Sequence, residues 1–406
     1  MKLGDCCKIN VSSYSNKENW PVIRYLDTGN LTEGRIDEIQ TFIPGKDKIP
    51  SRAKRKVKTG DILFSTVRPN QKHYGMVGTD TENLLVSTGF AVVTADSKLA
   101  DSRFIYYFLT QDHIVESLHV IAEQSVSAYP SIKPSDIEGI DVPLPELAEQ
   151  RKIAAILSAL DDKIELNRRI NANLEQQAAA IFKAWFIDAP EVRSWKKGTF
   201  ALLIEKIVSG DWGKDAPSGN NVEMVYCIRG TDIPEVRVGN KGKMPTRFIL
   251  PKNYAEKRLT DGDIVVEISG GSPTQSTGRA AVITSSLLNR YDKGMVCTNF
   301  CKALKPLAGY SMFIYYYWQY LYENNVFFAY ENGTTGIKNL DISGFIETEP
   351  IVVAPQELIT CFETLCRDYF ATIYANGLEN EKLAALRDAL LPRLMSGEID
   401  VSDVSL

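Results

Sequence analysis

Two long stretches of the chain carry the spacing of apolar and polar residues that is typical of helices. The first, residues 146–186, contains no Gly or Pro and is rich in residues that favour helices. Its seam residues recur at spacings of four and three, as in a coiled coil with polar residues at its centre: Ile153, Leu157, Leu160, Ile164, Asn167, Asn171, Leu174, Ala178, Ile181 and Trp185. At ~1.5 Å per residue, such a helix of about 40 residues reaches ~60 Å.

The second stretch follows Pro355, and we expect its stripe to comprise Leu358, Phe362, Leu365, Tyr369, Asn376, Leu383, Leu386 and Leu390. Gly377 interrupts it, which leaves a kink open, and Pro392 and Gly397 are expected to end it. Two such helices in one chain can pack antiparallel. Asparagines at Asn167, Asn171 and Asn376 would then either fix the register from buried positions or remain partly solvated; the sequence leaves both open.

Outside the helices the chain repeats itself. Val57–Val77 and Arg258–Ile283 each have a basic lead-in, a Gly-Asp turn, a short apolar strand, a polar loop and another strand. Further pairs follow in the same order, at separations of about 200 to 210 residues: Tyr25–Asn30 with Ile228–Asp232, Val86–Val93 with Val296–Leu304, Arg103–Leu109 with Met312–Trp318, Ser131–Ile140 with Gly336–Phe345, and Val142–Pro145 with Val352–Pro355. This ordered series indicates a duplication.

Each half combines strands after its Gly-Asp turn with an aromatic run, Phe104–Leu109 or Phe313–Leu321, for which we expect a helix. The predicted fold class is α+β: two similar mixed α/β domains separated by two long helices, packed as an antiparallel coiled coil with pseudo-twofold symmetry. The expected division is residues 1–145 for the first domain, 146–190 for the first helix, 191–355 for the second domain, and 356–406 for the second helix and tail.

Composition narrows the function classes. The net charge is −5, but residues 1–145 carry 17 basic and 18 acidic side chains and residues 196–355 carry 18 and 16, so both halves are near neutral. The seven cysteines and three histidines show no metal-ligand spacing, and no metal site is expected. Without a membrane-length apolar run or a secretory signal, we expect a cytoplasmic protein with no membrane partner.

Several stretches resemble the specificity subunits of type I restriction–modification enzymes. They are Gly60–Val77, Tyr129–Phe186, Asn332–Phe345 and Ala385–Ile399, and the resemblance covers essentially the whole chain. It implies two target-recognition domains that each read half of a split site on double-stranded DNA. It also implies two long helices that space the domains and dock two methylation subunits, which use S-adenosylmethionine. Restriction subunits, which are ATP-driven translocases and nucleases, would join the same complex, and this chain itself would carry no cofactor.

Candidate DNA contacts gather in loops beside the repeated strands. A basic cluster before the first Gly-Asp turn suits phosphate contacts: Arg52, Lys54, Arg55, Lys56 and Lys58. The loop after the following strand is dense in side chains that pair with base edges: Arg68, Asn70, Gln71, Lys72, His73 and Tyr74. A second loop of the same half adds Ser125, Ser127, Tyr129 and Lys133. A solvated loop surface is the alternative for each set.

In the second half, the equivalent loops offer a different polar set: Ser272, Thr274, Gln275, Ser276, Thr277 and Arg279, then Asn332, Thr334, Thr335 and Lys338. Lys241, Lys243 and Arg247 are candidates for phosphate contacts. The difference between the two sets predicts two different half-sites.

The sequence also lacks the motifs of catalysis. It holds no P-loop or dinucleotide-type glycine loop, no Asn/Asp-Pro-Pro-aromatic tetrapeptide of adenine methyltransferases and no nuclease carboxylate–lysine cluster. We therefore expect a non-catalytic subunit. The alternatives are a nuclease that works alone, a DNA-binding protein that acts alone, and a coiled-coil scaffold without a restriction partner.

Overall fold

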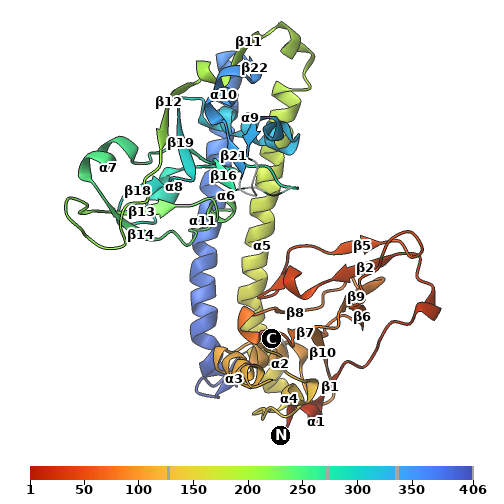
Figure 1. The fold of residues 1–406 in the computed structure, drawn as a ribbon. Coiled ribbons are helices and arrows are strands. Elements are labelled where there is room, and N and C mark those ends of the chain that lie inside the picture. The colour runs from red at the N-terminus through yellow and green to blue at the C-terminus, as the bar shows by residue number, and fades with distance from the viewer. Residues whose placement is uncertain (126–128, 271, 273, 334–337, 405–406) are drawn as a thin grey trace. The chain divides into compact units, whose positions relative to one another are not determined.

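The structure is a computed structural model, and it describes residues 1–125, 129–270, 272, 274–333 and 338–404. The chain forms two compact units (Figure 1). Unit 1 comprises residues 1–162 and 383–406, and unit 2 comprises residues 163–382. The division between the units therefore falls inside the two long helices, α5 (Leu147–Phe186) and α11 (Gln356–Met395).

Unit 1 contains two four-stranded sheets. The first has the order β1 (Cys7–Ile9), β10 (Phe90–Ala95), β7 (Ile62–Ser65), β8 (Tyr74–Met76) and is antiparallel throughout. The second has the order β5 (Gln40–Phe42), β2 (Ile23–Leu26), β9 (Leu84–Ser87), β6 (Ala53–Lys56), with β2 and β9 parallel. The hairpin β3 (Leu31–Thr32) and β4 (Arg35–Ile36), the helices α1 (Leu3–Cys6), α2 (Ser102–Leu109), α3 (Asp112–Glu123) and α4 (Pro134–Glu138), and the 3-10 turns η1 (Asn16–Glu18), η2 (Thr28–Asn30) and η3 (Pro69–Gln71) complete it.

Alternation along β7 divides the core of unit 1. Ile62 and Phe64 point to one face, where they join a cluster that includes Phe104 of α2 and Leu157 of α5. Leu63 points to the other face and joins a cluster with strands of the second sheet. The first sheet is thus buried on both faces, which explains why β7 reads as a continuous apolar run.

Unit 2 repeats this plan. Its four-stranded sheet has the order β12 (Ile204–Ser209), β19 (Cys301–Pro306), β15 (Ile264–Glu267), β17 (Ala280–Val282), matching the first sheet of unit 1 strand by strand. Its second sheet has the order β14 (Thr246–Ile249), β13 (Glu223–Ile228), β18 (Met295–Cys297), and again holds one parallel pair. The remaining elements are β16 (Ser269–Gly270), β21 (Lys338–Leu340), β20 (Glu331–Asn332), β11 (Lys196–Thr199), β22 (Pro350–Val353), α6 (Ile233–Arg237), α7 (Pro251–Lys257), α8 (Ser285–Leu288), α9 (Ser311–Glu323), α10 (Ile342–Thr348), η4 (Pro190–Ser194), η5 (Phe200–Leu202) and η6 (Val326–Tyr330).

The two Gly-Asp turns have the same geometry. Gly60 and Gly262 take positive φ values of 84° and 90°, which a glycine adopts without steric cost. In each turn the aspartate caps the backbone three residues earlier: Asp61 accepts from the Lys58 amide at 2.9 Å, and Asp263 from the Thr260 amide at 2.6 Å. The aromatic runs form α2 and α9, as expected from the sequence. The duplication therefore extends to the aspartate hydrogen bonds that hold the two turns.

Within each unit the long helices pack antiparallel (Figure 1). In unit 2, the Asn167 amide donates to the Asn380 side chain at 2.9 Å, and the Asn376 amide donates to the Asn171 side chain at 2.8 Å. In unit 1, Arg387 pairs with Asp161 at 2.7 Å. From one contact to the next, the residue number increases along α5 and decreases along α11, as antiparallel packing requires. Asn167 and Asn171 are buried and hydrogen-bonded, which agrees with the alternative in which the asparagines occupy buried positions between the helices. Asn376 is half-buried, which agrees with the partly solvated alternative.

Three expectations for α11 were wrong. Leu386, in the part of the helix that belongs to unit 1, is 48 % exposed. In the unit 2 part, the buried apolar residues include Ile359, Phe362, Cys366, Phe370 and Ile373, because unit 2 packs against a face slightly rotated from the predicted one. Pro392 lies inside the helix, in its last turn, where a missing amide removes only one hydrogen bond. Gly377 does not interrupt the helix. Among the described residues, no helix has both the length and the apolar character needed to cross a membrane.

Candidate nucleic-acid interface

The structure brings the two predicted loops of unit 1 together. The Ile132 amide donates to the Thr66 carbonyl at 2.9 Å, the Arg68 amide donates to the Pro130 carbonyl at 2.9 Å, and Val67 and Ser131 form a β-bridge. We call residues 66–73 and 129–133 loop cluster 1. Because backbone hydrogen bonds join the loops, their side chains are presented from one rigid base.

A one-turn 3-10 helix, η3, shapes the first loop of this cluster. Arg68 before it and Lys72 after it both adopt left-handed backbone conformations, with φ of 48° and 55°. Asn70 and Gln71, which lie between them, are exposed. The turn therefore presents Arg68, Asn70 and Gln71, three members of the predicted series, at the surface.

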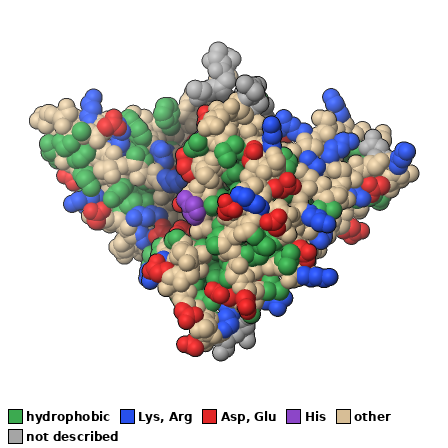
Figure 2. All heavy atoms as spheres, turned by 90° about the horizontal axis from the view of Figure 1, so that it is seen from below, with side chains coloured by type: hydrophobic (Ala, Val, Ile, Leu, Met, Phe, Trp, Pro, Cys, Tyr) green, Lys and Arg blue, Asp and Glu red, His purple; other side chains and the backbone are tan. Residues whose placement is uncertain are grey.

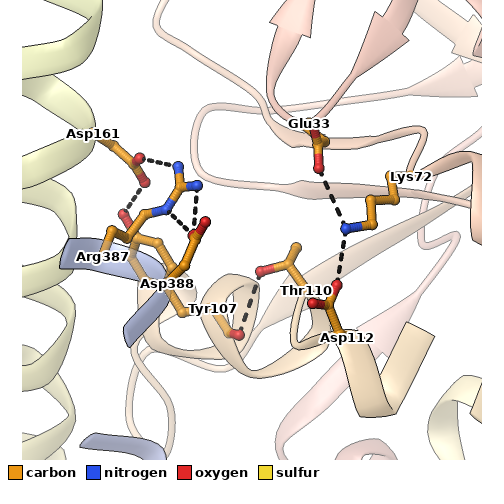
Figure 3. A network of polar contacts seen from close by, with 8 residues as sticks. All are labelled: Glu33, Lys72, Tyr107, Thr110, Asp112, Asp161, Arg387 and Asp388. Carbon is orange, nitrogen blue, oxygen red and sulfur yellow. Dashed lines mark hydrogen bonds and ion pairs between the residues drawn. The ribbon is translucent and has the colours of Figure 1, made fainter. Parts of the chain in front are cut away.

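Lys72 is engaged in the fold. Its Nζ lies 2.8 Å from Asp112 at the start of α3 and 3.5 Å from Glu33 in the β3–β4 turn (Figure 3). The hydrogen bond to Asp112 is the main cause that raises the pKa of Lys72. A lysine held by two carboxylates has less of its charge left for a phosphate or base. The ion pairs fasten the loop through Lys72, and its base contact stays a prediction.

Figure 3 also shows how the α2–α3 turn is fixed to the long helices. Tyr107 of α2 donates to Asp161 of α5 at 2.6 Å, and Arg387 of α11 pairs with the same carboxylate at 2.7 Å. Thr110, in the turn, donates to the Tyr107 carbonyl at 3.3 Å. The turn that carries Asp112 is thereby tied to both helices within unit 1.

Two further members of the predicted set face inward. Tyr74 is 6 % exposed and packs between Phe64 and Tyr106, so it belongs to the core and the expectation of a base contact was wrong. The aromatic ring gains more from burial against these neighbours than from exposure. His73 is half-buried, and its Nδ1 lies 2.7 Å from the Leu31 carbonyl oxygen, which fixes the ring on the β3 side of the loop.

The basic strip 52–58 adjoins loop cluster 1. The Thr88 amide donates to the Arg52 carbonyl at 2.9 Å, and the neighbouring Gly89 carbonyl accepts from the Thr66 amide at 2.8 Å. The strip divides into two groups. Arg52, Lys54 and Lys58 are exposed and form no ion pair among the described residues, whereas Lys56 pairs with Glu18 and lies over Trp20, and Arg55 is half-buried.

Unit 2 builds an equivalent cluster from residues 268–270, 272, 274–279, 331–333 and 338–340, which we call loop cluster 2. The Leu340 amide donates to the Ile268 carbonyl at 2.9 Å, as Ile132 does to Thr66 in unit 1. Ser269 and Asn339 are directly paired across β16 and β21 and their side chains are hydrogen-bonded. Sequence reasoning missed both residues, although the repeat places Ser269 opposite Val67 of cluster 1.

Several predicted residues of loop cluster 2 serve its own structure. Arg279 forms a two-pronged pair with Glu267, at 2.7 and 2.6 Å, and that hydrogen bonding is the main cause that raises its pKa. Lys338 pairs with Glu331 at 2.7 Å. Ser276 is 4 % exposed, so it cannot reach a surface ligand. For Ser276 the predicted contact was wrong, because the residue is buried, and its carbonyl accepts from the Tyr322 hydroxyl at 3.2 Å.

Among the other predicted members of loop cluster 2, Thr277 is buried and its amide donates to Glu331 at 2.6 Å, whereas the rest lie nearer the surface. Thr274 and Gln275 are exposed, and the Ser272 hydroxyl accepts from the Gln275 amide at 3.0 Å. Ser127, Thr334 and Thr335 lie outside the described residues. This leaves a short, uncharged surface in unit 2 where unit 1 presents charged side chains.

The three basic residues of unit 2 that were predicted to contact phosphates differ in their exposure to solvent. Arg247 is 5 % exposed and donates to the Trp212 carbonyl at 2.8 Å, so the expectation of a phosphate contact was wrong. Lys241 lies over the Tyr291 ring at 4.6 Å, and Lys243 is exposed. These two belong to the loop between α6 and β14.

Two further properties of the molecule are the distribution of its charged side chains and its potential metal ligands. On the face drawn in Figure 2, basic and acidic side chains are interspersed instead of gathering into one basic area. Within the part of the chain that the structure describes, no group of three His, Cys, Asp or Glu side chains is placed to hold a metal ion.

Comparison with known proteins relates this geometry to a family. A model of the type I restriction modification DNA specificity domain matches residues 1–176. The specificity subunit of the type I restriction enzyme HindI of Haemophilus influenzae is 26 % identical in an alignment that is 461 residues long with its gaps and covers 98 % of each chain. The specificity subunit of the type I enzyme MjaIX of Methanocaldococcus jannaschii is 28 % identical over 85 % of this chain and 79 % of its own.

The fold has a counterpart among solved structures. The crystal structure of a type I restriction–modification system S subunit from M. genitalium superimposes with a TM-score of 0.51, at 17 % identity, over 97 % of this chain and 95 % of that one. The family domain matches the N-terminal segment of unit 1 and most of the first long helix, and the relatives align over most or nearly all of the chain. The chain is therefore similar to the specificity subunits of type I restriction–modification enzymes.

Proposed function

We propose that this chain reads a two-part site on double-stranded DNA, with one half-site bound by each loop cluster. The observation that supports this is the matched position of the clusters. Each is closed by a backbone hydrogen bond to the same position of the repeated strand–loop segment, the Thr66 carbonyl in unit 1 and the Ile268 carbonyl in unit 2. A framework repeated so closely, with different polar side chains at its edge, suits two readers of different sequences.

The two clusters would read different bases. Loop cluster 1 offers the exposed Arg68, Asn70 and Gln71, whose side chains match the hydrogen-bonding edges of guanine and adenine. Loop cluster 2 offers Ser272, Thr274 and Gln275, without an exposed unpaired cation among its described residues. The asymmetric site would therefore have one half read with charge and the other read by neutral groups.

The chain would depend on partners for its grip on DNA and for chemistry. Its two halves are near neutral, and phosphate neutralisation supplies much of the affinity of DNA-binding proteins. We propose that it is non-catalytic and docks two methylation subunits on its long helices, with restriction subunits joining them. In this account S-adenosylmethionine and ATP bind to those partners, and the complex acts on DNA in the cytoplasm.

Methylome sequencing tests the proposal. A host that carries the chain with its methylation subunits is compared with the same host after deletion of the chain alone. The proposal predicts that one split, adenine-methylated motif disappears on deletion and returns on complementation. An unchanged set of methylated motifs would refute it.

The rival functions give different results. Purified chain that cuts or methylates DNA without partners would favour an enzyme that acts alone. A scaffold without a DNA role predicts that the complete complex protects no DNA sequence from nuclease digestion. A catalytically inactive methylation subunit in the same assembly is the matched control, because it keeps DNA binding while removing methylation.

A further inference from the structure

Arg68 stands where the duplicated copy has a glycine. The hydrogen bonds that match Thr66 with Ile268 place Arg68 opposite Gly270, two residues further along each chain segment. Both residues have positive φ, 48° for Arg68 and 147° for Gly270. A non-glycine residue in the left-handed region costs ~1–2 kcal/mol. Unit 1 therefore keeps an arginine side chain at a position where glycine would be the relaxed choice, which motivates a search for its role.

The Arg68 side chain is available for a ligand. It is exposed and forms no ion pair with any described residue, unlike Lys72 beside it and Arg279 and Lys338 in loop cluster 2. Its guanidinium instead lies over the Tyr129 ring, 5.5 Å from the ring centroid. Stacking on a ring orients the guanidinium plane and leaves its N–H edges directed outward.

The backbone beneath Arg68 is held from both sides. Its amide donates to the Pro130 carbonyl at 2.9 Å, and its carbonyl accepts from the Gln71 amide at 2.9 Å. At the far end of the turn, Lys72 is fastened to Asp112 and Glu33 (Figure 3). A side chain on such a base loses little further freedom on binding, which strengthens each hydrogen bond that it makes.

We propose that Arg68 is the specificity-determining residue by which unit 1 reads a guanine in the major groove, with Tyr129 and Lys72 as positioning residues. A guanidinium presents two parallel donors that match the O6 and N7 acceptors of guanine and of no other base. The inference rests on the proposed function and adds to it the base and the residue. It also explains why the strained backbone of Arg68 is kept: the positive φ holds a side chain that reads a base.

The test uses the chain assembled with the methylation subunits of its host, carrying Arg68→Ala, Arg68→Lys or Arg68→Gly. Methylome sequencing gives the motif of each assembly. Arg68→Ala and Arg68→Gly are expected to lose preference for guanine at one position of one half-site, by roughly 5- to 150-fold, the discrimination of one bidentate pair. Arg68→Lys keeps donors for the same acceptors and should lose less of that preference. The other half-site should stay unchanged.

Two comparisons separate recognition from structure. Arg68→Gly relieves the positive φ, so its unfolding midpoint should equal or exceed that of the parent chain although it loses guanine preference. Arg52→Ala, which removes an exposed cation of the neighbouring strip, should weaken binding to all sequences alike and leave the motif unchanged. Lys72→Met should lower methylation rates while the motif keeps its guanine, and Lys72→Arg should restore them.

The outcomes are distinguishable. If Arg68→Ala and Arg68→Gly assemblies still require guanine at every position where the parent does, the role of Arg68 is overturned while the proposed function stands. If the parent assembly methylates no split motif at all, the proposed function itself fails. A stable Arg68→Gly chain with one degenerate position supports the inference.

Discussion

Replacing Gly377 with alanine should destabilise unit 2, against the usual effect of this change in a helix. Gly377 lies in the continuous helix α11 and is buried. A Cβ added there would lie 2.6 Å from the carbonyl carbon of Gly239 and still closer to its oxygen. Gly239 itself has φ of 85° and supports a hydrogen bond of 2.6 Å from Arg290 to its carbonyl. The backbone at Gly239 therefore approaches helix α11 so closely that neither Gly239 nor Gly377 has room for a Cβ atom.

The magnitude follows from opposing effects. Alanine in place of glycine in a helix gains about 1 kcal/mol. Against this, forcing the loop away costs about 1–3 kcal/mol for overpacking and about 1.5–3 kcal/mol for the lost hydrogen bond to a charged group. We expect a net loss of roughly 1.5–5 kcal/mol, and a fall in Tm of about 3–20 °C for a unit of this size.

Urea and thermal unfolding followed by circular dichroism measure the effect. Ala375→Gly is the matched control, because Ala375 is exposed on the same helix and should lose only about 1 kcal/mol through helix propensity. A Gly377→Ala chain that melts at or above the parent temperature would refute the close approach of Gly239 to α11.

Other predictions use the same measurements. Glu363 is 4 % exposed and burial raises its pKa, so the stability it contributes is largest at low pH and is lost as pH rises above its ordinary value. Glu363→Gln should therefore be at least as stable as the parent at pH 8 and lose that advantage near pH 4; an unchanged difference between the two would contradict the burial argument. Asn171→Ala removes the acceptor of Asn376 and the donor to two backbone carbonyls, and should cost about 2–4 kcal/mol in chemical denaturation; a loss under 1 kcal/mol would argue against the buried asparagine contacts. Gly262→Ala should destabilise more than Gly60→Ala, because the new Cβ lies 2.7 Å from a serine oxygen in unit 2 but 3.6 Å in unit 1; equal melting temperatures would show that the serine yields freely.

Much of the fold could be predicted from the sequence because its signals are local or repeated. Composition alone places α5 within a residue of its observed start, and the two Gly-Asp turns locate β7 and β15. The face that α11 buries could not be predicted as well. Leu386 lies on the expected stripe but is exposed, because the choice among neighbouring apolar residues depends on the surface against which the helix packs.

For the candidate site, the sequence indicates which loops to consider but not how each side chain is engaged. It singles out the loops because side chains able to pair with base edges are dense in them. The sequence could not separate available cations from paired ones, because the partner carboxylates are distant along the chain: Lys72 pairs with Asp112, 40 positions away. Tyr74 is polar enough for a loop and apolar enough for a core, and only packing decides between them. The positive φ of Arg68 likewise has no local sequence signal.

The central claim, that the duplicated units read separate halves of one site, is tested by methylome sequencing of two paired variants. One carries Arg68→Ala with Gln71→Ala in loop cluster 1, and the other carries Thr274→Ala with Gln275→Ala in loop cluster 2; all four residues are exposed. The account predicts that each pair relaxes one half of the methylated motif, and that the two pairs relax opposite halves. Relaxation of both halves by either pair, or of the same half by both, would contradict it.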